Sequence, residues 1–99
     1  MLNIQKLVEN KSAVFSLVGR LDTVTAPELE QSLKETMPEL TDLTLDFAGL
    51  EYISSAGLRV LLAAQKVMNK QGSMRIKNVA ETIMEIFEVT GFSDILTIV

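Results

Sequence analysis

The sequence predicts an α/β fold, with one mixed, mostly parallel sheet that has an antiparallel edge strand and helices packed on it. Strand-like segments alternate with segments of helical apolar spacing in the order ββαβαβα, and parallel neighbouring strands need helical crossovers. The chain has 99 residues, of which 47% are hydrophobic. The hydrophobic content suffices for the core of a single domain over residues 1–99, and the length leaves no room for a second domain.

A β-hairpin is predicted at the start of the chain. Residues 3–9 and 13–18 alternate or run apolar, and the pair Asn10-Lys11 between them favours a short turn. Gly19 is expected to end the second strand. This hairpin supplies the antiparallel edge of the sheet.

The first helix has a marked beginning and end. Thr25 and Glu28 have the spacing of a capping box, and Pro27 lies in the first turn. The helix is expected to carry Leu29 and Leu33 inward. It should stop near Pro38.

The central segment reads as strand, turn and helix. Residues 43–47 form the predicted strand, and Ala48-Gly49 is expected to break it. Apolar residues then recur at helical spacing over 56–71, and Gly72 is the predicted C′ residue of that helix.

The last third contains a short strand and an amphipathic helix. The strand is predicted at 74–76 and the helix at 80–89, ending at Thr90-Gly91. Residues 95–99 form an apolar tail to which the pattern assigns no conformation.

Composition excludes several classes of function. The net charge is −4 and no two Lys or Arg residues are adjacent, so nucleic acid is not an expected partner. Cysteine and histidine are both absent, which removes thiolate chemistry, the commonest general base and the commonest metal ligand. We therefore expect that the protein is not an enzyme and that it binds neither a cofactor nor a metal ion.

Membrane insertion is not expected either. Met1 leads directly into strand-like sequence, and nowhere do 18 apolar residues run together. The expected location is the cytoplasm.

Two adjacent serines precede the 56–71 helix. A hydroxyl at that point can accept a hydrogen bond from a free backbone N–H, and capping needs only one serine. Free amides and the helix dipole also favour a negative charge there. Ser54 and Ser55 therefore predict a cap and, beside it, a site that could carry a phosphate.

The predicted sheet brings two loops to one edge. Residues 19–24 follow the second strand and residues 48–55 follow the third, and functional loops gather at the carboxyl ends of parallel strands. Arg20, Asp22 and the two serines should therefore share one rim. Asp22 could orient a serine or a partner loop there, or could simply be a turn residue.

The motif DFAGLEYISSAGLR over residues 46–59 closely resembles the signature of the STAS domain, specifically that of stand-alone bacterial anti-sigma factor antagonists. Gly19-Arg20-Leu21-Asp22, followed by the helix with Ala26, is similar to a second landmark of the family. The resemblance covers essentially the whole chain.

The resemblance implies a regulatory function. In that family an unphosphorylated antagonist binds an anti-sigma factor that is also a serine kinase, and so frees the sigma factor. Phosphorylation of a serine in the motif ends binding, and a serine phosphatase restores it. By position the acceptor is Ser55, two residues before Gly57, with Ser54 as the alternative because many members have Asp there. We expect a monomer.

Further partner contacts are predicted along the 56–71 helix. Arg59, Lys66 and Lys70 form a narrow stripe, which is either a solvated face or a basic contact strip for an acidic partner. Arg59 could meet partner carboxylates or the phosphate itself. Gly57 indicates close approach, either by a partner or by packing within the domain. The predicted partner-binding set is Asp22, Ser54, Ser55, Gly57, Arg59 and Lys66.

The sequence is also compatible with two other classes of function. A STAS subunit of a transport assembly, such as one for lipid trafficking, would bind an ATPase without a phosphorylation switch. An enzyme with Ser55 as nucleophile is disfavoured because the chain has no G-x-S-x-G elbow and no histidine to activate the hydroxyl.

Overall fold

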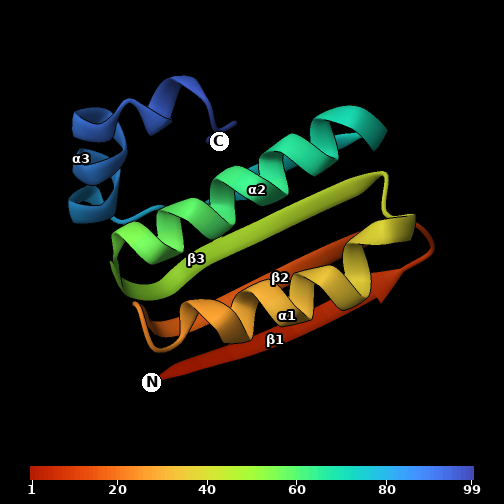
Figure 1. The fold of residues 1–99 in the computed structure, drawn as a ribbon, viewed down its shortest axis with the longest axis horizontal. Helices are drawn as coiled ribbons and strands as arrows, with labels where there is room; N and C mark the ends of the chain where they lie inside the picture. The colour runs from red at the N-terminus through yellow and green to blue at the C-terminus, as the bar shows by residue number, and fades with distance from the viewer.

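The computed structural model describes residues 1–99 and contains one sheet with the strand order β1-β2-β3-β4 (Figure 1). As predicted, β1 is antiparallel to β2, and β2, β3 and β4 are parallel. The strands are β1 (Leu2–Glu9), β2 (Ser12–Leu21), β3 (Asp42–Ile53) and β4 (Ser73–Lys77). The helices are α1 (Ala26–Thr36), α2 (Ser55–Gln71) and α3 (Glu81–Thr90), with short 3₁₀ turns η1 (Met37–Glu39) and η2 (Phe92–Asp94).

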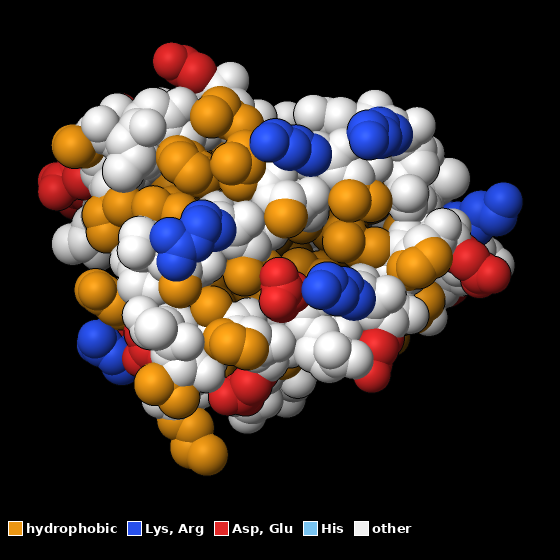
Figure 2. All heavy atoms as spheres, viewed as in Figure 1, with side chains coloured by type: hydrophobic (Ala, Val, Ile, Leu, Met, Phe, Trp, Pro, Cys, Tyr) orange, Lys and Arg blue, Asp and Glu red, His pale blue; other side chains and the backbone are white.

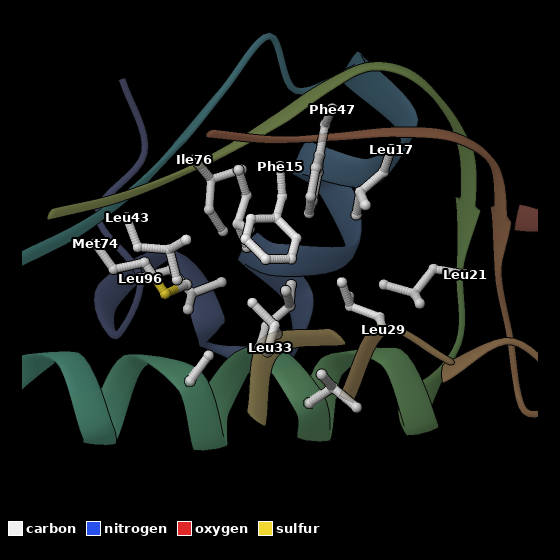
Figure 3. Packing of buried hydrophobic residues seen from close by; sticks show 14 of the residues in the cluster. Phe15, Leu17, Leu21, Leu29, Leu33, Leu43, Phe47, Met74, Ile76 and Leu96 are labelled. Atoms are coloured by element: carbon white, nitrogen blue, oxygen red, sulfur yellow. The ribbon is translucent and has the colours of Figure 1, made fainter. Parts of the chain in front are cut away.

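The core lies between one face of the sheet and the helices. Phe15 and Phe47 point from β2 and β3 toward the helices, and Leu29 and Leu33 of α1 meet them as predicted (Figure 3). Phe87 brings α3 onto the same face, with its ring centroid 6.5 Å from that of Phe47. Burial of this apolar surface is the main force that holds the two layers together.

The opposite face of the sheet carries polar side chains together with exposed apolar ones. Arg75 of β4 forms a 2.7 Å ion pair with Asp42 of β3 and donates to Thr44 Oγ1 at 3.0 Å. Leu7 of β1 and Val18 of β2 are exposed apolar residues. All three helices therefore pack on one side of the sheet.

The predicted end of β3 at Ala48-Gly49 is wrong, because the strand continues to Ile53. The pairing with β2 shifts register at this point, so that two β3 residues oppose one β2 residue. Asp46 Oδ1 accepts the Ala48 N–H at 3.0 Å and holds this bulge. A Cβ on Gly49 would lie 2.8 Å from Val18 Cγ2, so the glycine serves close strand packing.

The predicted end of β2 at Gly19 is also wrong, because β2 reaches Leu21. Gly19 has a φ of +113°, and a Cβ there would overlap the carbonyl oxygen of Met1. A second register shift follows Gly19, so the glycine marks an irregularity within the ladder.

The ends of the other elements agree closely with the predictions. The first helix stops at Thr36, before Pro38, and the last ends at Thr90 with Gly91 in the left-handed region. Gly72 ends α2 as predicted, but with extended backbone and not as a left-handed C′ residue. A Cβ there would overlap Thr41, so close approach explains this glycine.

The C-terminal tail lies beside the outer edge of β4. The Ile76 N–H donates to the Thr97 carbonyl at 2.9 Å, and the Val99 N–H donates to the Ile76 carbonyl at 2.9 Å. Leu96 is buried in the core. The tail thereby covers the edge that β4 would otherwise expose.

Candidate functional site

The site is formed where β2 and β3 end side by side. Leu21 pairs with Ile53 as the last residue of each strand, and the Ser54 N–H donates to the Leu21 carbonyl at 2.9 Å. Helices α1 and α2 both begin at this end of the sheet (Figure 1). The loops are shorter than predicted, but Arg20, Asp22 and the two serines do reach the same rim.

The two serines have different environments. Ser54 is the N-cap of α2, and its Oγ accepts the Gly57 N–H at 3.4 Å. Ser55 is the first residue of the helix, its side chain is exposed, and its hydroxyl makes no hydrogen bond. The first amides of α2 have no intrahelical partner, so a negative charge on Ser55 would meet free N–H groups and the positive end of the helix dipole.

Gly57 faces inward. It is buried in the first turn of α2, and a Cβ would lie 2.8 Å from Leu21 Cγ and 2.9 Å from Ile53 Cγ1. Packing of α2 against the ends of β2 and β3 therefore requires this glycine. Gly57 presents no side chain at the surface, so its contacts favour packing within the domain over contact with a partner.

Asp22 holds the turn between β2 and α1. Its Oδ1 accepts the backbone N–H groups of Val24 and Thr25, each at 3.0 Å. These bonds, the one to the Thr25 N–H foremost, hold the pKa of the Asp22 carboxyl below its ordinary value. The turn interpretation of Asp22 is therefore the one that its contacts favour.

The predicted capping box at Thr25 is wrong. The Thr25 hydroxyl donates to the Arg20 carbonyl at 2.7 Å and accepts the Asp22 N–H at 2.9 Å, so it makes no cap to α1. Thr25 is buried, and its backbone is already helical. The hydroxyl therefore ties the end of β2 to the start of α1, a task that spacing alone did not reveal.

An arginine–tyrosine stack borders the rim on the open side of the sheet. The guanidinium carbon of Arg20 lies 4.3 Å from the centre of the Tyr52 ring, and Arg20 Nε lies 3.8 Å from Asp22 Oδ2. Tyr52 is a site residue that the sequence pattern did not indicate. The two residues become neighbours only through the second register shift between β2 and β3, for which the sequence has no signal.

The predicted basic stripe is exposed. Arg59, Lys66 and Lys70 all lie on the solvent side of α2, and none of them forms an ion pair. Ala63 and Val67 are exposed between them, and Figure 2 shows separate Lys and Arg side chains with apolar atoms in the spaces. The stripe thus combines free cations with small apolar contacts.

The structure contains no group of three carboxylates placed to hold a metal ion. None of its helices combines the length and the apolar character that crossing a bilayer requires. The rim thus offers the free hydroxyl of Ser55 at the N-terminus of α2, with charged groups nearby.

A family model and a relative of known name both match nearly the whole chain. The family model described as STAS domain matches residues 3–99. An anti-sigma-B factor antagonist of Staphylococcus epidermidis is 31% identical over 97 residues, which cover 96% of this chain and 90% of that protein.

Two solved structures are similar in fold. An anti-sigma factor antagonist from Mycobacterium paratuberculosis has a TM-score of 0.89 at 22% identity, over 99% of this chain and 85% of the other. Bacillus SpoIIAA in the phosphorylated form has a TM-score of 0.76 at 18% identity, over 98% of this chain and 91% of the other. At these sequence identities the two similarities show a shared fold.

Proposed function

The chain belongs to the STAS domain family, and we propose that it is a non-catalytic, cytoplasmic, monomeric anti-sigma factor antagonist switched off by phosphorylation of Ser55. Unphosphorylated, it binds an anti-sigma factor with serine-kinase activity and thereby frees a sigma factor. A serine phosphatase reverses the modification. The observation that carries the proposal is the free, exposed Ser55 hydroxyl at the N-terminus of α2.

Ser55 is a better acceptor than Ser54. The Ser54 hydroxyl is half-buried and already caps the helix, so its movement into a kinase active site would first break the bond to the Gly57 N–H. Ser55 has no such bond. Its position two residues before Gly57 also matches the family motif.

The switch acts by charge at the interface. A phosphate adds about −1.5 to −2 charges, and at a helix N-terminus that charge is favourable to the fold by roughly 0.3–1 kcal/mol. A partner surface that fits a neutral hydroxyl rejects a dianion through desolvation and like-charge repulsion, which costs several kcal/mol, on the order of a hundredfold in affinity. Binding is therefore lost while the domain stays folded.

The proposed partner-binding surface surrounds Ser55. Arg59 and Lys66 continue it along α2 and would face acidic groups of the partner. Ser54 contributes the cap, and Asp22 contributes by fixing the turn beside it. The transport-subunit alternative predicts an ATPase partner and no phosphorylation at this surface.

A labelling experiment tests the proposal. The chain is incubated with radiolabelled ATP and, one at a time, the serine-kinase anti-sigma factors of its source organism. We expect one kinase to label the wild type and the Ser54→Ala and Ser12→Ala variants, but not Ser55→Ala. Phosphopeptide mapping to Ser54 would reverse the assignment, and absence of labelling by every such kinase would overturn the function.

A further inference from the structure

A groove runs between the first turns of α1 and α2, and Ala56, the residue after Ser55, lines it. Its volume is about 400 Å³. The α1 side is formed by Thr23, Pro27 and Glu30, and the α2 side by Ala56, Arg59 and Val60. We call it the α1–α2 groove.

Small and apolar side chains leave the groove open. Ala56 directly follows the proposed acceptor Ser55, and Ala26 and Val60 are buried where the two helices meet. Pro27, on the α1 side, is exposed. A partner that covers Ser55 has this concave, partly apolar surface next to Ala56 within reach.

Two charges of opposite sign flank this apolar surface. Arg59 lies on the α2 side and Glu30 on the α1 side, and both side chains are exposed. They are not paired with each other or with any other residue, since the ion pairs of the structure are Arg20–Asp22 and Arg75–Asp42. Unpaired charges on facing walls fit a ligand that carries the complementary charges in a fixed direction.

From these observations we infer that the α1–α2 groove receives an apolar anchor side chain of the serine-kinase anti-sigma factor, flanked in that partner by an acidic group facing Arg59 and a basic group facing Glu30. The inference rests on the function proposed above. Binding energy concentrates in such anchors, which fill a concave pocket near the centre of an interface. The groove would hold the kinase in register with the Ser55 hydroxyl.

Filling the groove tests the anchor. Ala56→Phe fills it from α2, and Thr23→Leu fills it from an exposed turn position. Calorimetric titration with the kinase that labels the wild type should show each variant binding at least about tenfold more weakly. Ala48→Leu, an exposed alanine on the open face of the sheet, should bind as the wild type does. Thermal melts establish that each variant is folded.

Charge reversal tests the direction of the complementary charges. Glu30→Lys and Arg59→Glu should each weaken binding about tenfold, and the double variant should bind no better than either single one. Recovery of affinity in the double variant would mean that the two residues act on each other, and it would overturn the inference.

Failure of the inference is distinct from failure of the proposed function. If the wild type is labelled and bound but a folded groove-filling variant binds equally well, the anchor is wrong and the switch stands. If no kinase binds or labels the wild type, the proposed function fails and takes the anchor with it. If the wild type is a dimer in solution and Ala56→Phe is a monomer, the groove is filled by a second copy, which also contradicts the inference.

Discussion

Replacing each serine of the pair should separate helix capping from phosphate acceptance. Ser54→Ala removes the hydroxyl that accepts the Gly57 N–H. Loss of a serine cap costs about 0.5–2 kcal/mol, and the 3.4 Å length of this bond favours the lower half of that range. We expect the free energy of unfolding to fall by about 0.5–1 kcal/mol, which for a domain of this size lowers the melting temperature by about 2–8 °C.

Ser55→Ala should give the opposite pattern. Its exposed hydroxyl makes no hydrogen bond, so the free energy of unfolding should change by less than about 0.5 kcal/mol. Urea unfolding followed by circular dichroism measures both variants, and labelling by the partner kinase is measured on the same samples. The reasoning would be refuted if Ser54→Ala lost labelling at unchanged stability, or if Ser55→Ala lost stability and kept its label.

Three further predictions concern packing, burial and pH. Gly57→Ala should lower the free energy of unfolding by about 1–2 kcal/mol in urea titrations, because overpacking against Leu21 and Ile53 exceeds the gain in helix propensity. Unchanged or higher stability would show that the close contacts relax freely. Gln65→Met should raise the melting temperature, because the buried Oε1 of Gln65 has no hydrogen-bond partner, which costs about 1–3 kcal/mol. A lower melting temperature would show that the hydrogen bond from Gln65 Nε2 to Asn69 contributes more to stability than the unpaired oxygen costs. Hydrogen bonds to the charged carboxylates lower the pKa of Asp22, Asp42 and Asp46 in the folded chain. Their contribution to stability should therefore be fully present above the unfolded-state pKa of about 3.9 and be lost as the pH falls through the lower folded-state pKa values. Urea unfolding midpoints that did not decrease between about pH 5 and pH 2 would contradict this.

The order and type of the elements could be predicted because the apolar spacing is strong along the chain. The hairpin, the parallel crossovers and the start of α2 follow from patterns within single segments. The two adjacent serines could be read in the same way, since a helix start needs one cap and the sequence offers two hydroxyls.

The extent of β3 could not be predicted from its sequence. Ala48-Gly49 has the composition of a strand end, but the bulge depends on Asp46 accepting the Ala48 N–H and on the approach of Val18 to Gly49. These are contacts between or across strands, and a pattern along one strand does not contain them.

The start of α1 shows a different reason for error. Thr25 is a good capping residue, and its spacing to Glu28 predicts a capping box. In the structure the Thr25 hydroxyl bonds to the Arg20 carbonyl, and the Asp22 carboxylate takes the turn amides. A local pattern does not reveal that the Thr25 hydroxyl has a competing bond to the end of a strand.

Parts of the site also needed three-dimensional packing. The stack of Arg20 on Tyr52 depends on a register shift between two strands. The α1–α2 groove depends on how two helices far apart in the sequence lie on the sheet. Neither has a signature within one segment.

The central claim is that a phosphate on Ser55 excludes the partner by charge without opening the fold. The most direct test compares the enzymatically phosphorylated and unphosphorylated chains by amide hydrogen exchange and by calorimetric titration with the kinase anti-sigma factor. We predict equal protection across residues 55–71 in both forms, together with a loss of affinity on the order of a hundredfold on phosphorylation. Loss of protection in α2, or unchanged affinity with the phosphate in place, would contradict it.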